Sequence, residues 1–259
     1  AQFGALCPIM ENGGGGEHRP WMYDDDVETI YRRFTRLHHE LIPYLYSQGA
    51  KAWADGVSLM QFTGDQYTYQ LGEDLLVAAM VEPGTQRRVP FPPGRWRPWL
   101  NEDAVHDGDQ TLQLDVPYSE FPVFVRDGAL IPLEVTDRCT GHGGPFSRDH
   151  LTLAVYPRED ESHSFDLCEE QGPGARFRWR DESGVLTLET TDTAQPLLWR
   201  VRGRGDATRV LTAEGEELPR VDSADQLEEH HQCWTTDGDS LLLIRLKDAA
   251  AGMTLQIMR

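Results

Sequence analysis

The side chains best suited to chemistry stand in residues 11–21, on either side of a run of glycines at 13–16. His18 and Arg19 can form hydrogen bonds with hydroxyl groups, and Trp21 offers the apolar face of its indole ring. This set suits a pyranose, which has hydroxyl groups at its edge and C–H groups on its faces. A loop tethered by packing of Trp21 fits the same residues, so both interpretations stay open.

Glu11 brings a carboxylate to the start of this stretch. We predict that Glu11 is not a general acid or base. Three roles are left for it: an acceptor for a sugar hydroxyl, a partner of Arg19, or a surface charge.

Other patterns that could carry chemistry are weak. The glycine run is not followed by the Lys-Ser/Thr of a phosphate-binding loop and has no strand before it. Adjacent histidines, at 38–39 and 230–231, point to different sides of a helix or strand and are poor chelators. The four cysteines show no CxxC spacing. We therefore predict no metal site.

The charge of the chain limits its partners. In 259 residues, 24 Lys and Arg stand against 43 Asp and Glu, a net charge of -19. This acidic field repels nucleic acid and anionic membranes but is compatible with a neutral sugar. No apolar run approaches the roughly 20 residues that span a bilayer.

The ends of the chain and its cysteines indicate a cellular compartment. The N-terminus has no basic start and no long apolar run, so it is not a signal peptide, and the missing Met indicates a chain cut from a longer one. Scattered cysteines indicate free thiols in a reducing compartment. We expect a cytoplasmic protein.

One helical segment must position the candidate residues that precede it. Residues 24–55 carry apolar side chains at spacings of three and four, which predicts an amphipathic helix. Asp25 and Glu28 predict a capping box at its start, and Pro43 predicts a kink or a break. The apolar face of this helix needs a partner surface.

Short strands are predicted for the rest of the chain. From about residue 65, alternating runs are separated by Gly, Pro and Asp, without helices between them. This pattern is typical of antiparallel sandwiches rather than βαβ units, and a loop at 137–149 is predicted to join two of them. The predicted strands are 75–81, 111–116, 123–125, 151–156, 164–167, 175–179, 185–190, 197–201, 209–211, 240–246 and 253–258.

Motifs in fixed order carry a family resemblance. Gly-Ala-Leu-Cys-Pro begins at Gly4, and Ile-Pro-Tyr-Leu-Tyr begins at Ile42. Pro-Gly-Arg-Trp follows at Pro93, with Phe-Val-Arg-Asp-Gly-Ala-Leu-Ile-Pro after it, and Ser-Phe-Asp-Leu-Cys-Glu-Glu-Gln-Gly begins at Ser164. This order resembles the C-terminal part of glycoside hydrolase family 31, the α-glucosidase and α-xylosidase family.

The resemblance implies a mainly β chain with three parts. Residues 1–64 would be the last piece of a (β/α)8 catalytic barrel, with its seventh strand in 3–12 and its eighth in 56–60. A proximal β-sandwich would follow at 65–136 and a distal one at 137–259. Loops that follow barrel strands build the active site in such folds. The resemblance therefore implies that substrate is bound by Glu11, Asn12, His18, Arg19 and Trp21.

The chain departs from the family pattern where specificity is set. Many members have Arg-Asn-His where this chain has Glu11, Asn12 and Gly13, so the sugar-contacting histidine has no counterpart at position 13. His18 could approach the same place. In the last motif, Cys168 replaces a tyrosine and Gln171 an aspartate. The preferred α-linked sugar is not predicted.

The resemblance also implies an activity. Members hydrolyse terminal α-glycosidic bonds with retention through two aspartates and no cofactor, and both aspartate motifs are missing here, so we expect no catalytic residue and no turnover in this chain. Its expected partners are an α-linked oligosaccharide or glycoside and the remainder of the barrel, with no nucleic acid and no membrane. Two other classes stay open: a carbohydrate-binding module, and a purely structural β-domain.

Overall fold

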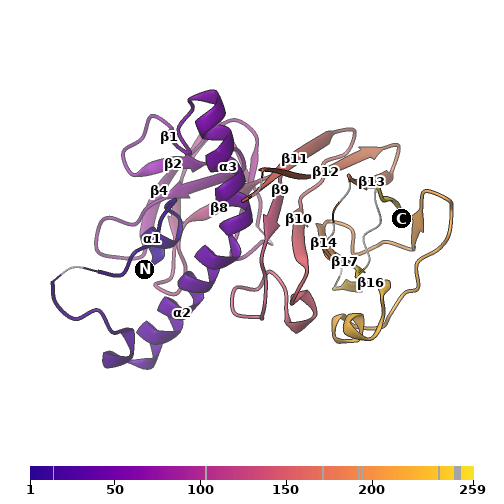
Figure 1. Ribbon diagram of the computed structural model, residues 1–259. Helices are drawn as coiled ribbons and strands as arrows, with labels where there is room; N and C mark the ends of the chain where they lie inside the picture. The colour runs from indigo at the N-terminus through magenta and orange to yellow at the C-terminus, as the bar shows by residue number, and fades with distance from the viewer. Residues whose placement is uncertain are drawn as a thin grey trace. The chain divides into compact units, whose positions relative to one another are not determined.

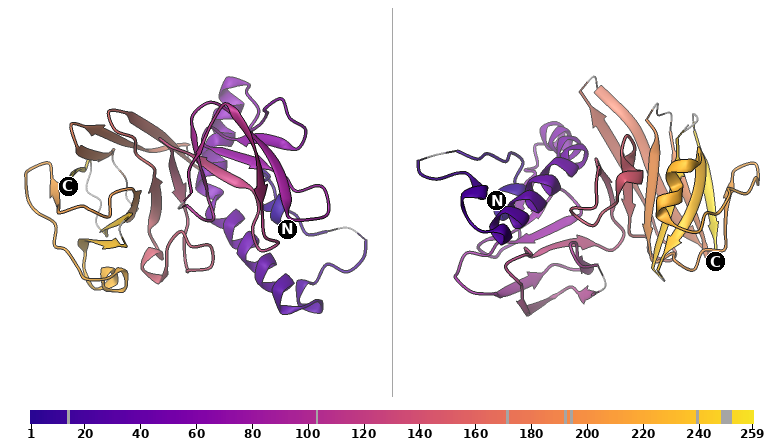
Figure 2. Two further views of the ribbon diagram at one scale, coloured as in Figure 1. Left: turned by 180° about the vertical axis from the view of Figure 1, so that it is seen from behind. Right: turned by 90° about the horizontal axis from the view of Figure 1, so that it is seen from below.

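A computed structural model describes residues 1–13, 15–102, 104–170, 172–191, 193, 195–238, 240–247 and 252–259. Two compact units divide the chain (Figures 1 and 2). The first unit comprises Ala1–Glu40, Gln48–Asp127 and Cys139–Gly141; the second comprises Leu41–Ser47, Gly128–Arg138 and His142–Arg259. The predicted division at residues 64 and 136 stays a prediction.

The helices gather near the N-terminus. They are α1 (Gln2–Ala5), the 3-10 turn η1 (Pro20–Met22), α2 (Asp25–Glu40) and α3 (Ile42–Asp55). The predicted break is confirmed: the helix predicted over 24–55 is two helices, because Pro43 has no amide hydrogen to continue α2. Among the described helices, none is long and apolar enough to cross a membrane.

The start of α2 differs from the prediction by one residue. The amide of Val27 donates to Asp24 Oδ1 at 2.8 Å, so Asp24 caps the helix and the predicted box from Asp25 is wrong. Glu28 instead pairs with Arg32 one turn later at 2.6 Å. A capping carboxylate reaches the amide three residues after it, and for the amide of Val27 that carboxylate belongs to Asp24.

The first unit is built on a six-stranded sheet in the order β1-β2-β3-β8-β5-β6 and a two-stranded ribbon of β4 and β7. All of these pairs are antiparallel. The strands are β1 (Met60–Phe62), β2 (Thr68–Leu71), β3 (Leu75–Ala78), β4 (Gln86–Phe91), β5 (Arg95–Pro98), β6 (His106–Asp107), β7 (Gln110–Asp115) and β8 (Val123–Arg126).

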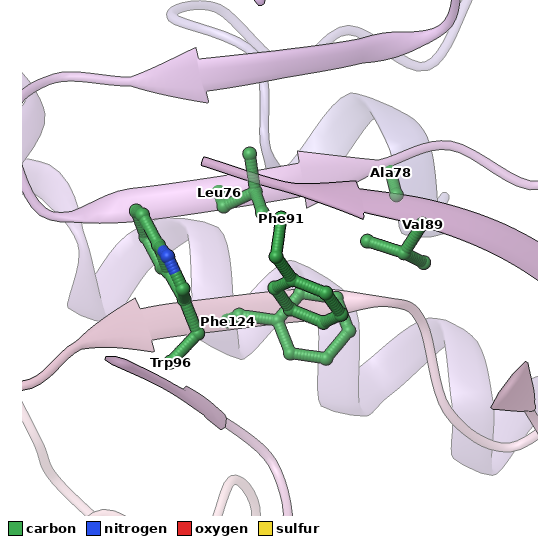
Figure 3. Close-up of a cluster of buried hydrophobic side chains, with 6 residues drawn as sticks. All are labelled: Leu76, Ala78, Val89, Phe91, Trp96 and Phe124. Carbon is green, nitrogen blue, oxygen red and sulfur yellow. The ribbon is translucent and has the colours of Figure 1, made fainter. Parts of the chain in front are cut away.

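Alternation along these strands makes a core. β3 and β4 each turn two side chains inward at a spacing of two, where they meet large rings from β5 and β8 (Figure 3). The rings of Phe91 and Phe124 meet edge to face at 4.8 Å, and Trp96 Nε1 donates to the carbonyl of Pro92 at 3.0 Å. The cluster consists of Leu76, Ala78, Val89, Phe91, Trp96 and Phe124.

The second unit contains two five-stranded sheets, ordered β16-β17-β14-β10-β9 and β11-β12-β13-β18-β15. Phe177 on β12 and Trp199 on β14 meet edge to face at 6.1 Å, which joins the two sheets through their inner faces. The strands and turns are β9 (Leu130–Leu133), η2 (Pro145–Ser147), β10 (Leu151–Val155), β11 (Ser162–Glu169), β12 (Gly172–Glu182), β13 (Val185–Thr190), β14 (Leu197–Arg202), β15 (Arg209–Thr212), η3 (Ala224–Glu229), β16 (Gln232–Asp237), β17 (Leu241–Leu246) and β18 (Thr254–Met258).

One strand pair of the second unit is parallel. β10 and β14 run side by side in register from Leu151 with Leu197, whereas every other pair in the two sheets is antiparallel among the described residues. β10 is buried along its whole length, as strands in parallel pairs are. The predicted mainly β architecture is confirmed, with this one parallel pair inside it.

Two finer predictions are wrong. Residues 3–12 hold no strand: they form the end of α1 and a loop. The predicted eighth barrel strand at 56–60 is displaced, because β1 begins at Met60 and pairs antiparallel with β2. A parallel barrel strand needs parallel neighbours for its backbone groups, and none of the described strands offers them to these two segments.

Candidate substrate-facing loop

The segment before the loop at residues 11–21, called the site loop below, is firmly attached to the first unit. Ala5 and Leu6 are fully buried, and the hydroxyl of Tyr69 donates to the carbonyl of Leu6 at 2.9 Å. His38 Nδ1 lies 3.1 Å from the carbonyl oxygen of Ala5. Gln2 Nε2 donates to the carbonyls of Tyr118 and Glu120 at 2.8 and 2.9 Å. The site loop therefore leaves from a fixed base.

The end of the site loop is also fixed. Pro20 is buried at the first position of η1, where its missing amide is harmless and its restricted φ suits the turn. η1 leads within two residues to Asp24, which caps α2. The loop is thus held at both ends by elements of one unit.

Two sets of hydrogen bonds shape the loop itself. Asn12 Nδ2 donates to the carbonyl of His18 at 3.0 Å and draws the two arms together. Arg19 donates to Glu17 three times: from its amide at 2.9 Å, from Nε at 2.7 Å and from a terminal nitrogen at 2.6 Å. These bonds, first from the side chain and then from the amide of Arg19, lower the pKa of Glu17 to about 2.

Glu11 and Gly13 are in close contact. A Cβ built on Gly13 would lie 2.8 Å from Glu11 Oε1, so the carboxylate occupies the space that a side chain at position 13 would take. Because Glu11 is exposed and its carboxylate is the far end of a flexible side chain, it can turn away at little cost, so this contact alone does not require glycine at position 13.

The residues predicted to bind substrate differ in their exposure, and their role stays a prediction. Glu11, Asn12 and Arg19 are exposed, His18 is half-buried, and Trp21 keeps 64% of its surface exposed. An exposed indole beside carboxylate and amide groups can stack on a sugar face and bind hydroxyls. The tethered-loop alternative requires a packed indole, and the indole of Trp21 is not packed away.

The sequence reasoning missed Glu17. Arg19 binds Glu17 and not Glu11, so the guanidinium of Arg19 is partly used inside the loop. The carboxylate of Glu11 is left for other contacts. Opposite charges two residues apart in an extended segment were the available signal, since side chains at that spacing point to the same side. Arg19 is therefore a residue that shapes the loop as well as one that faces solvent.

Two family models match the chain in order. Residues 1–48 match the glycosyl hydrolases family 31 TIM-barrel domain, and residues 56–131 match the glycosyl hydrolase family 31 C-terminal domain. The chain is 28% identical to alpha-glucosidase 2 of Bacillus thermoamyloliquefaciens over 66% of this chain and 23% of that protein. It is 22% identical to an alpha-xylosidase of Saccharolobus solfataricus over 79% of this chain and 31% of that protein.

Solved structures show the same fold. A cycloalternan-forming enzyme from Listeria monocytogenes superposes with a TM-score of 0.87 at 22% identity, over 99% of this chain and 27% of that chain. A dextranase from Flavobacterium johnsoniae superposes with a TM-score of 0.84 at 20% identity, over 100% of this chain and 36% of that chain. In both comparisons the chain matches only about a third or less of the larger protein.

Proposed function

Because the chain belongs to glycoside hydrolase family 31 and corresponds to the C-terminal portion of a family enzyme, we propose that it serves a retaining hydrolase of terminal α-linked sugars. The observation that carries this proposal is the match to two consecutive family domains in their natural order. The relatives act, by their names, on α-glucosides and α-xylosides. We propose one of these two classes as the substrate.

In this proposal the site loop forms part of the rim of the active site. Trp21 stacks on a sugar ring, while Glu11, Asn12 and His18 bind hydroxyl groups and Arg19 keeps the loop in shape through Glu17. Support comes from the exposure of the indole and from the anchoring of both loop ends. The nucleophile and the acid/base are aspartates of barrel strands outside this chain.

The proposal includes the remainder of a barrel as partner. Several large hydrophobic side chains of the first unit are exposed in a series, from the segment that matches the barrel domain to the start of the segment that matches the C-terminal domain. Burial of such surface drives association. A lone exposed residue is ordinary, but this series is dense. It comprises Phe3, Ile9, Trp21, Met22, Tyr23, Val27, Trp53, Val57, Phe62 and Tyr67.

Complementation tests the function. The chain is co-expressed with the preceding part of the α-glucosidase from Bacillus thermoamyloliquefaciens, and hydrolysis of aryl α-glucosides and α-xylosides is measured. We expect no turnover from the chain alone and measurable turnover from the pair. Hydrolysis by the chain alone would overturn the assignment of the aspartates, and a stable complex without turnover on either substrate would overturn the proposed activity.

A cytoplasmic location is part of the same proposal. None of the four cysteines, all of which lie among the described residues, forms a disulfide. Free thiols are typical of a reducing compartment. Fractionation of cells that express the native gene tests the location, and recovery of the protein from the culture medium or periplasm would contradict it.

A further inference from the structure

The second unit contains a groove that is lined by no residue of the site loop. Its volume is about 720 Å³, within the usual range for small-molecule sites. The first turns of α3 form one wall, β11 forms another, and segments at 134–136, 149–151 and 195–196 complete the lining. Below, this hollow is called the α3 groove.

The walls of the α3 groove are joined by specific contacts. The amide of Cys168 donates to Ser47 Oγ at 2.9 Å, and that hydroxyl donates to the carbonyl of Pro43 at 2.7 Å. Tyr44 and Phe165 stack with ring centres 5.9 Å apart and planes at 26°. The start of α3 is thus locked onto β11, and the groove exists before any ligand enters.

The lining has one aromatic ring and many hydrogen-bond acceptors. Tyr46 is half-exposed on the α3 wall. Four carboxylates line the groove, those of Glu134, Asp149, Glu169 and Glu170, and none of them forms an ion pair within the described part of the chain. The described lining contains no Lys or Arg. These carboxylates would repel an anionic ligand, whereas a ligand rich in hydroxyl donors would find acceptors.

The lining also includes a buried acceptor without a donor. His150 is 6% exposed, and its Nδ1 lies 2.9 Å from the carbonyl oxygen of Arg148, so Nδ1 carries the proton and Nε2 is an acceptor. No donor reaches Nε2 among the described residues. Burial lowers the pKa of His150, with Arg245 and Lys247 acting in the same direction and Arg148 and Asp149 against it. A neutral imidazole of this kind gains from a hydroxyl donor.

The carboxylates are spread along the groove. Among the described residues, no three His, Cys, Asp or Glu side chains converge closely enough to hold a metal ion. Separate acceptors and an aromatic ring in one groove match the hydroxyl groups and the apolar face of a pyranose. We propose that the α3 groove binds a neutral α-linked oligosaccharide, with Tyr46 stacked on one sugar ring; the choice of sugar rests on the proposed function.

Titration of the 259-residue chain tests this site. Isomaltotriose and maltotriose are added separately, and binding is followed by calorimetry and by amide shifts in NMR spectra. We expect saturable binding with shifts centred on 42–47 and 167–170. Tyr46→Ala should weaken it about fivefold, because a stacked ring contributes on the order of 1 kcal/mol. Glu169→Gln should weaken it less.

Controls separate this site from the other possibilities. Tyr118→Ala removes a tyrosine of the first unit that is 71% exposed, and it should leave binding unchanged. Binding that Trp21→Ala abolishes and Tyr46→Ala leaves intact would support the site loop and overturn the groove. Absence of saturable binding would overturn sugar binding in the α3 groove. The complementation experiment does not depend on that result, so the proposed function would be judged separately. Tight, salt-sensitive binding of spermidine without sugar binding would also overturn the proposed role of the α3 groove.

Discussion

The two units differ in the tryptophans that they leave exposed. In the second unit Trp179, Trp199 and Trp234 are each 1% exposed and fill the sandwich. In the first unit Trp96 and Trp99 are also 1% exposed, but Trp21 and Trp53 are 64% and 91% exposed. The difference teaches that the second unit buries all three of these indoles in its own core, whereas the first unit presents two indoles that a partner or ligand can cover.

The sharpest test of this contrast removes one ring from each unit. Trp199→Ala should lower the free energy of unfolding by about 3–5 kcal/mol, because a fully buried indole leaves a cavity. Trp53→Ala should change it by about 0.5 kcal/mol or less. Urea denaturation of the isolated chain measures both. Equal losses would show that Trp53 is covered in solution, and the contrast between the units would fail.

The buried ion pair of the second unit should have the next largest effect. Asp181 and Arg204 bond directly, with side chains 2% and 3% exposed. Asp181→Ala should cost at least about 3 kcal/mol by leaving a buried guanidinium unpaired. The exposed pair of Asp166 and Arg176 is the matched control, and Asp166→Ala should have little measurable effect. Urea denaturation that ranks the two variants the other way would refute this assignment.

The cap of α2 tests how firmly the first unit holds the end of the site loop. Asp24→Ala should destabilise the chain by about 1 kcal/mol, since it leaves the amide of Val27 without its acceptor. Asp25→Ala, at the position that the sequence favoured, should cost clearly less. Thermal unfolding followed by circular dichroism compares the two, and a larger effect at Asp25 would return the cap to the predicted position.

The smallest effect concerns pH. The pKa of Glu17 is lowered to about 2, so its bond with Arg19 supports the loop above the ordinary pKa of a glutamate, near 4.3, and that support is lost as the pH falls through about 2. NMR titration of the Glu17 carboxyl should show the low pKa, and Arg19→Ala should return it to the ordinary range. An unchanged pKa in that variant would mean that Arg19 does not cause the shift.

The sequence determined several features by local rules. The break at Pro43 followed from a missing amide hydrogen, and the mainly β architecture followed from alternation between turn residues. The family followed from motifs of fixed order and spacing. The break and the alternation depend on neighbours within a few residues, which is the range over which side-chain type decides backbone conformation, whereas the family depends on the order of motifs along the chain.

Other features were decided only by the tertiary structure. The segment at 3–12 forms no strand, because a strand depends on backbone partners that sequence alone does not place. Arg19 binds Glu17 rather than Glu11, and the α3 groove unites residues from 42 to 196. Such pairings depend on which surfaces meet after folding. Local propensity therefore gave the elements, and long-range packing chose the partners of the residues that carry the chemistry.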